Sequence, residues 1–98
     1  MPQQQSDIRE RTKYKKPRLY KVIMFNDEYT TMEFVVRVLE KVFHKSHEEA
    51  KRLMIDVHNK GQATVGIYSY DMARSKVEQT SLMAREQGYP LRLAFIPE

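Results

Sequence analysis

The sequence contains no cysteine and has only three glycines and four prolines in 98 residues. The absence of cysteine excludes disulfide bonds, thiolate metal sites and cysteine nucleophiles, and it fits a reducing compartment. The longest apolar runs, 22–25 and 93–96, are four residues each, whereas a membrane-spanning helix needs about 20. The first residues also lack the apolar stretch of a signal peptide. We therefore expect a cytoplasmic protein that does not enter a membrane.

The positive net charge of +4 is confined to the start of the chain. Residues 1–18 carry six basic and two acidic side chains, and the basic and acidic side chains of residues 19–98 balance. Nucleic-acid-binding domains usually carry their excess charge on a patch of the fold. Residues 1–17 are polar and lack apolar periodicity, which is typical of disorder. The sequence thus predicts a disordered N-terminal extension at 1–18 and one neutral domain at 19–98.

Apolar periodicity and turn signals divide the domain into six elements in the order β-α-α-β-α-β. Strands are expected at 19–25, 63–69 and 91–96. The first two helices begin at capping boxes, Thr30 to Glu33 and Ser46 to Glu49, and the second ends at Gly61. The third helix spans 71–87, and the side chains it turns inward are Ala73, Val77, Thr80 and Ala84. The predicted class is α+β, with a small three-stranded antiparallel sheet packed against three helices.

Polar residues gather at the corner between the first strand and the first helix, from Asn26 to Thr30. Turn formation and helix capping account for such residues. The functional alternative is a polar rim, because Asn supplies a donor and an acceptor and Asp accepts from a cation. His58 near the end of the second helix has the same two interpretations, a packed or capping residue or a ligand-binding one. An acid–base pair of Asp27 and His58 lacks a nucleophile, a metal set and an oxyanion loop.

Met32 and Met54 lie on the predicted inner faces of two consecutive helices. Methionine commonly fills gaps in a core, and it is equally suited to line a pocket for varied apolar side chains. His44 and His47 straddle a helix break without a carboxylate or thiol to complete a metal set. We therefore expect neither a metal site nor a cofactor.

Five motifs follow one another along the domain. They are Tyr20-Lys21-Val22-Ile23, the stretch from Asn26 to Val36, Met54-Ile55-Asp56-Val57-His58 with Gly61, Gly66-Ile67-Tyr68 followed by Lys76-Val77, and Pro90-Leu91. In this order and spacing the sequence resembles the ClpS family, whose members are adaptors of the bacterial AAA+ protease ClpAP. The resemblance covers roughly residues 19–96 without insertions.

The resemblance implies an adaptor that recognises N-degrons, substrates whose first residue is Leu, Phe, Tyr or Trp. The positions that match the family's site for the free amino group and first peptide unit are Asn26, Asp27 and His58. Those that match its hydrophobic pocket are Thr30, Met32, Val35, Met54, Val57 and Leu91. Met32 would be the gatekeeper that disfavours β-branched first residues. Glu28 stands where the family often has a second Asp.

The resemblance also implies a partner, the N-terminal domain of a ClpA-type unfoldase. The docking positions would include Tyr68, Asp71 and Lys76, and the extension before residue 19 would act on the unfoldase during delivery. The protein would modulate the protease's choice of substrate without being an enzyme, and we expect a monomer. Two alternatives stay open. One is a paralogous adaptor with a narrower preference for the first residue, and the other is a small basic protein that associates with nucleic acid.

Overall fold

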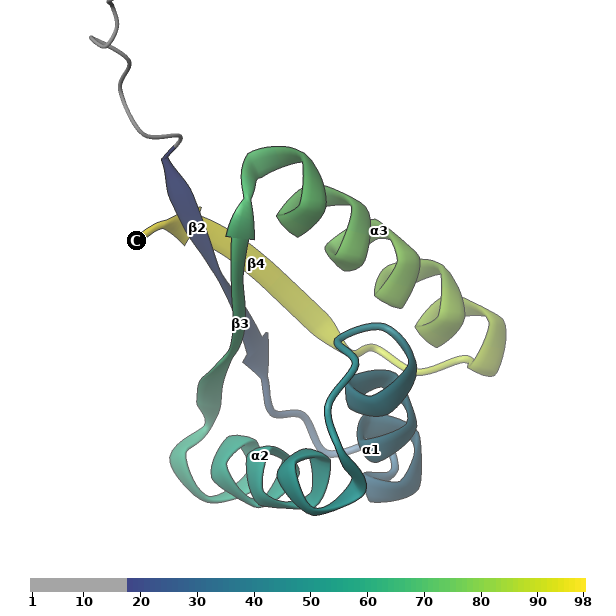
Figure 1. The fold of residues 1–98 in the computed structure, drawn as a ribbon. Helices are drawn as coiled ribbons and strands as arrows, with labels where there is room; N and C mark the ends of the chain where they lie inside the picture. The colour runs from purple at the N-terminus through teal and green to yellow at the C-terminus, as the bar shows by residue number, and fades with distance from the viewer. Residues whose placement is uncertain (1–17) are drawn as a thin grey trace, which may run out of the picture.

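The computed structural model describes residues 18–98 (Figure 1). Almost all of the extension expected at 1–18 lies outside the described residues. The elements in chain order are β2 (Leu19–Phe25), α1 (Met32–Lys41), α2 (His47–Lys60), β3 (Gln62–Ser69), α3 (Tyr70–Gln87) and β4 (Arg92–Pro97). The predicted order β-α-α-β-α-β is therefore confirmed, with ends that move by one or two residues.

The three strands form one antiparallel sheet in the order β3-β2-β4. β2 lies at the centre of this sheet, where Val22 faces Phe95 on β4 and Gly66 on β3. A bulge between Val22 and Ile23 shifts the register with β3. The α+β class with a small antiparallel sheet and three helices is confirmed.

The hydrophobic core lies between the sheet and the helices. β2 contributes Val22 and Met24, which are fully buried because alternate side chains of a strand point to the same face. α3 contacts all three strands, whereas α1 and α2 pack against each other at the end of the sheet where β2 ends and β3 begins (Figure 1). None of the helices within residues 18–98 is both long and apolar enough to cross a membrane.

The first helix begins one residue later than the sequence predicted. Thr31, and not Thr30, is the N-cap of α1, and its hydroxyl accepts a hydrogen bond from the Phe34 amide at 3.1 Å. Glu33 consequently stands at the second helical position and cannot complete a capping box. The physical reason is competition, because the Thr30 hydroxyl donates to the Asp27 carboxylate at 2.8 Å.

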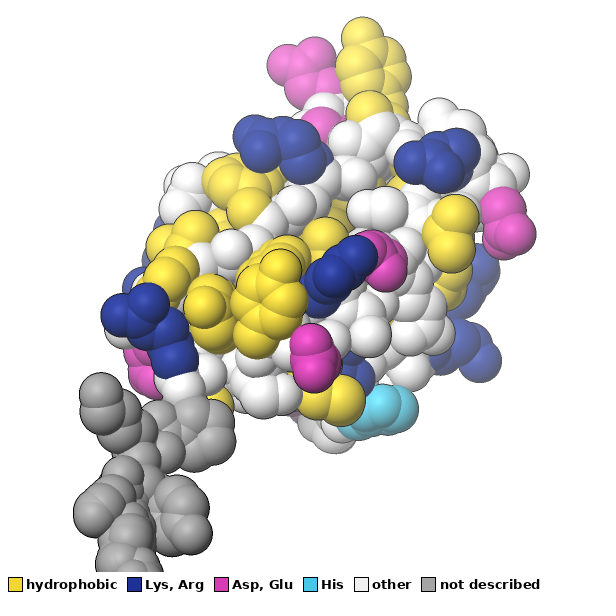
Figure 2. Space-filling model, turned by 90° about the horizontal axis from the view of Figure 1, so that it is seen from above, with side chains coloured by type: hydrophobic (Ala, Val, Ile, Leu, Met, Phe, Trp, Pro, Cys, Tyr) yellow, Lys and Arg dark blue, Asp and Glu magenta, His cyan; other side chains and the backbone are white. Residues whose placement is uncertain are grey.

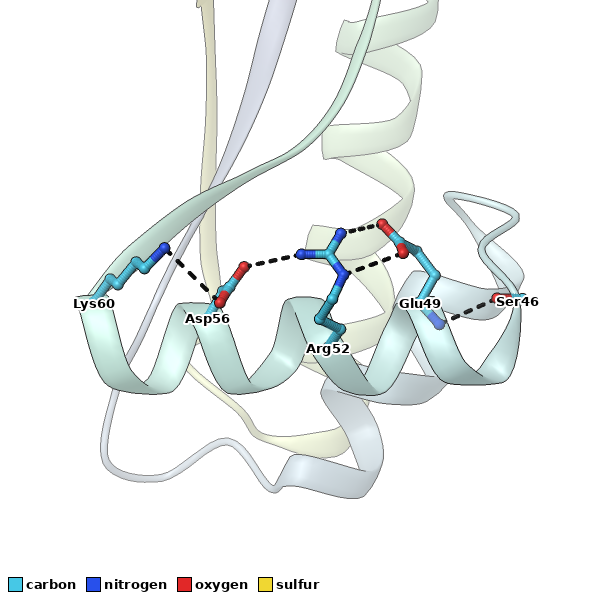
Figure 3. A network of polar contacts seen from close by, with 5 residues as sticks. All are labelled: Ser46, Glu49, Arg52, Asp56 and Lys60. Carbon is cyan, nitrogen blue, oxygen red and sulfur yellow. Dashed lines mark hydrogen bonds and ion pairs between the residues drawn. The ribbon is translucent and has the colours of Figure 1, made fainter.

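The second helix begins as predicted at Ser46, whose hydroxyl accepts from the Glu49 amide at 3.1 Å. The Glu49 carboxylate does not return a bond to Ser46 but pairs with Arg52. The Asp56 carboxylate contacts Arg52 at 3.3 Å and Lys60 at 3.9 Å. Acidic and basic side chains therefore alternate along one side of α2 (Figure 3). The hydrogen bond from Arg52 lowers the pKa of Glu49.

The third helix buries a residue that the sequence placed elsewhere. Ala73, Thr80 and Ala84 are buried as predicted, but Val77 is only partly buried and Lys76 is 7% exposed. The Lys76 ammonium donates to the Val42 carbonyl oxygen at 2.7 Å. It also lies 5.2 Å from the ring centroid of Tyr68. Lysine is buried only with such partners.

The end of the molecule where β2 and α3 begin exposes apolar side chains. Seen face-on in Figure 2, this end carries a group of hydrophobic side chains bordered by basic and acidic ones. Tyr20, Tyr70 and Phe95 stack edge to face, with ring centroids 5.4–6.0 Å apart. These contacts hold the start of α3 against β2 and β4.

Candidate functional site

A cavity of about 360 Å³ lies between the corner after β2 and the helices α1 and α2. Its lining residues are Asn26, Asp27, Glu28, Thr30, Met32, Val35, Met54, Val57 and His58. Eight of these nine are positions that the sequence marked for the amine site and the hydrophobic pocket. The structure therefore brings residues from two distant segments, 26–35 and 54–58, into one concave surface.

Asp27 organises the corner. Its Oδ1 accepts from the Tyr29 amide at 2.8 Å and the Thr30 amide at 2.7 Å, and its Oδ2 accepts from the Thr30 hydroxyl at 2.8 Å. Partial burial acts to raise the pKa of Asp27, but these hydrogen bonds outweigh it and the pKa is lower than 3.8. A carboxylate offers about four acceptor positions. Asp27 is thus ionised at neutral pH, with about one position left for a further donor.

Asn26 and His58 form the other polar part of the cavity. The backbone N–H of Asn26 donates to the Gly61 carbonyl oxygen at 2.9 Å, which ties the corner to the end of α2. Gly61 ends α2 with a left-handed φ of 87°, a conformation that costs a residue with a side chain more than glycine. Among residues 18–98, neither the side-chain amide group of Asn26 nor the His58 ring has a hydrogen-bond partner. Both side chains are exposed and free to bind a ligand.

Aliphatic side chains and methionines form the rest of the cavity. Val35 of α1 and Val57 of α2 are 8% and 3% exposed and make a rigid floor. Met54 is partly buried, and Met32 at the start of α1 is 52% exposed. An exposed, flexible methionine beside a rigid apolar floor can adapt to the side chain that enters.

Two residues differ from the sequence-based set. Leu91 is 7% exposed, but it packs in the hydrophobic core and is not among the lining residues. Glu28 lines the cavity and was absent from the predicted set. The sequence could have indicated Glu28 by its position next to Asp27, because neighbouring residues in a tight turn lie close together.

The three positions marked for docking lie away from the cavity, where β3 joins α3. Asp71 is exposed, Tyr68 is partly buried, and Lys76 is buried against it. Burial raises the pKa of Tyr68. Gly66 leaves room for this tyrosine, because a Cβ atom there would lie 2.5 Å from the Tyr68 ring. The lack of a side chain at Gly66 therefore permits the observed position of the Tyr68 ring.

No group of three or more His, Asp or Glu side chains within residues 18–98 could hold a metal ion. The cavity combines an anionic carboxylate, two polar side chains that have no partner in the described part of the chain, and an apolar floor. Such a surface can bind a ligand that is cationic at one end and apolar at the other.

Comparisons with known proteins point to one family. The family model described as "ATP-dependent Clp protease adaptor protein ClpS" matches residues 15–94. The ClpS adapter protein of Acetivibrio thermocellus is 53% identical over 85 residues, covering 87% of this chain and 86% of that protein. That of Deinococcus radiodurans is 48% identical over 89 residues, covering 91% and 79%. The structure of Agrobacterium tumefaciens ClpS2 bound to L-phenylalaninamide matches with a TM-score of 0.82 at 38% identity, covering 85% of this chain and 100% of that one.

Proposed function

The chain belongs to the ClpS family of Clp protease adaptors, and from this premise we propose that it is an N-degron receptor. It binds proteins that begin with a free amino group and Leu, Phe, Tyr or Trp, and it delivers them to a ClpAP-type protease. The family is one of adaptors and not of proteases. The observation that carries the proposal is the cavity that joins Asn26, Asp27 and His58 to the apolar floor.

The apolar part of the cavity provides affinity for a large side chain. Burying a Leu or Phe side chain contributes about 1.5–3 kcal/mol. Charge-assisted hydrogen bonds contribute roughly 1.5–3 kcal/mol each. A few such interactions, less the cost of ordering the peptide, give micromolar affinity, near −8 kcal/mol. This strength suits a carrier that must release its cargo.

The polar part explains the requirement for a chain start. The Asp27 carboxylate has about one acceptor position left, which a terminal ammonium can fill. Asn26 and His58 then bind the first peptide unit. An internal segment has no ammonium, so it would cover these groups without satisfying them, at a cost of about 1–3 kcal/mol each. The cavity thus selects against internal sequences.

The relative from Agrobacterium tumefaciens supports this assignment, since its ligand, L-phenylalaninamide, consists of a free α-amino group, a benzyl side chain and a carboxamide. We propose that the cavity of this chain holds the same three groups. We propose Met32 as the gate against β-branched first residues, because its exposed side chain lines the cavity at the start of α1. Leu91 belongs to the same buried core as Val35 and Val57.

Docking to the N-terminal domain of a ClpA-type unfoldase is proposed for the surface at the start of α3. Asp71 is exposed between Tyr70 and Met72, which are 46% and 50% exposed. The buried Lys76 supports this surface from behind, next to Tyr68. Residues 1–18 act during delivery, so their deletion should leave peptide affinity intact and impair degradation of N-degron substrates by the protease.

The decisive experiment is fluorescence anisotropy with peptides that differ only in residue one. We expect peptides that begin with Leu, Phe, Tyr or Trp to bind, and N-acetylation to abolish binding. Asn26→Ala and His58→Ala should weaken binding about tenfold or more, since each removes charge-assisted or buried hydrogen bonds. Asn59→Ala is the matched control, because Asn59 is an exposed neighbour that does not line the cavity.

Equal affinity of free and acetylated peptides would contradict the amine site. Binding of only one or two of the four first residues would instead favour the paralogous adaptor with a narrower preference. The nucleic-acid alternative depends on the charge of residues 1–18. It predicts a steep salt dependence and a mobility shift with nucleic acid, neither of which the adaptor should show.

A further inference from the structure

A second concave surface continues from the proposed degron cavity. This groove, of about 530 Å³, is lined by Met32, Glu33, Val36, Arg37, Glu40 and Lys41 of α1 and by His47, Lys51 and Met54 of α2. Met32 and Met54 belong to both surfaces. The two methionines therefore form the boundary across which a bound chain would pass from the cavity into the groove.

The helix periodicity explains why the groove is continuous. His47, Lys51, Met54 and His58 follow at spacings of three and four residues, so they lie along one face of α2. Met32, Val36 and Glu40 do the same on α1. The cavity contacts the start of α1 and the end of α2, while the far end of the groove contacts the end of α1 and the start of α2. There the Glu40 carboxylate meets His47 Nδ1 at 2.6 Å.

The unpaired charges of the groove are mainly basic. Within residues 18–98, Arg37, Lys41 and Lys51 have no carboxylate within 4.0 Å. The Glu40 carboxylate is paired with His47. Among the acidic residues that line the groove, Glu33 at the cavity end is thus the one without a partner within residues 18–98. On α2, by contrast, Glu49 and Asp56 are paired with Arg52 on another side of the helix (Figure 3).

We propose that this groove holds the residues that follow the N-degron residue and prefers acidic side chains among them. The proposal rests on the proposed function, because it needs the first residue to be anchored in the cavity. An extended chain advances about 3.3 Å per residue, and alternate side chains share a face. With residue 1 in the cavity, the side chains of residues 3 and 5 point the same way, about 7 and 13 Å further on.

Those distances match the basic residues. α1 rises about 1.5 Å per residue, so along the helix axis Arg37 stands about 7.5 Å and Lys41 about 13.5 Å beyond Met32. Lys51 stands one turn from Met54 on the opposite wall. An acidic side chain at peptide position 3 would thus reach Arg37 and Lys51. One at position 5 would reach Lys41. The aliphatic side of the groove, Val36 with the two methionines, accommodates their stems.

The experiment compares peptides of equal length on the full chain by fluorescence anisotropy at low salt. All three peptides begin with leucine. The first carries glutamate at positions 3 and 5, the second carries glutamate at positions 2 and 4, and the third carries glutamine at positions 3 and 5. Each exposed ion pair contributes about 0.2–1 kcal/mol, so we expect the 3,5-glutamate peptide to bind about three- to tenfold more tightly than either of the others. The advantage should shrink at 0.5 M salt because screening weakens exposed pairs.

The variant Arg37→Gln/Lys41→Gln should remove this advantage, so that it binds the 3,5-glutamate peptide no more tightly than the other two peptides. Arg74→Gln/Arg85→Gln is the matched control, since it makes the same change in net charge on α3, outside both surfaces. It should keep the advantage.

Equal binding of all three leucine peptides would overturn the groove proposal and leave the N-degron receptor intact. Loss of the advantage in the α3 control, or its persistence in the groove variant, would also overturn it, because the preference would then not come from the groove. Failure of every leucine peptide to bind would overturn the proposed function and this proposal with it.

Discussion

The buried ammonium of Lys76 offers the sharpest test of the packing between α3 and α1. Its Nζ donates to the Val42 carbonyl oxygen at 2.7 Å and lies 5.2 and 6.0 Å from the ring centroids of Tyr68 and Phe43. Val42 is the C-cap of α1, where carbonyl groups lack partners within the helix and favour a cation. Lys76→Met keeps the length and apolar stem of the side chain and removes only the ammonium.

The expected cost of Lys76→Met is about 1–3 kcal/mol of unfolding free energy. A hydrogen bond from a charged donor contributes about 1.5–3 kcal/mol, and an orphaned buried carbonyl costs about 1–3 kcal/mol. The relief of a desolvated charge offsets part of this loss. A domain of typical stability, about 5–15 kcal/mol, remains folded after such a change. Peptide binding can therefore be measured on the same variant.

Urea unfolding followed by circular dichroism measures the effect. We expect the midpoint to fall by about 1 M with an unchanged slope, since m is about 1–3 kcal/mol/M for small proteins. Arg85→Met is the control, because Arg85 is exposed on the same helix and its replacement should change stability by less than about 0.5 kcal/mol. Equal midpoints for Lys76→Met and the parent chain would refute the stabilising role of the bond to Val42. N-degron peptide affinity should stay unchanged.

Three further predictions follow from the corner, the gate and the docking surface. The pKa of Asp27 is lower in the folded state, so its ionised form contributes fully to folding stability above the unfolded value of about 3.8, and this contribution is lost as the pH falls through the folded pKa. Asp27→Asn should therefore lower the urea midpoint at pH 7 and weaken the decrease of that midpoint in acid. Met32→Ala should admit peptides that begin with Ile or Val, and unchanged selectivity would remove Met32 from the gate. Gly66→Ala should displace the Tyr68 ring, cost about 1–3 kcal/mol by overpacking and weaken unfoldase docking while sparing peptide affinity, and docking at the parent's strength would contradict the assigned surface.

Local patterns were enough to predict the order of the elements and the two segments that form the cavity. The strand 19–25 is marked by β-branched and aromatic residues ahead of Asn26-Asp27, and α2 is delimited by Ser46 and Gly61. The side chains near both ends then had to meet, because the Asn26 amide bonds to the Gly61 carbonyl. That bond joins residues 35 positions apart, and it follows from the fold and not from either segment alone.

The features that the sequence did not reveal all depend on competition or on distant partners. Either Thr30 or Thr31 could cap α1, and the outcome is decided by the Asp27 carboxylate, which accepts from Thr30. Lys76 would be assigned to the surface from its type alone, since the carbonyl that accepts its hydrogen bond lies 34 residues earlier. The groove required the relative placement of α1 and α2, each of which reads by itself as an ordinary amphipathic helix.

Asp27 has two roles that constrain each other. Its carboxylate holds the corner through three hydrogen bonds, and the position left over is the one that a terminal ammonium would use. Any replacement of Asp27 therefore changes the folding of the corner and the charge of the cavity together. The side chains of Asn26 and His58 have no partner within residues 18–98. Replacing them therefore tests peptide binding without removing hydrogen bonds that stabilise this part of the fold. If their alanine variants kept the parent's stability and lost affinity, recognition of the chain start would be assigned to the cavity itself.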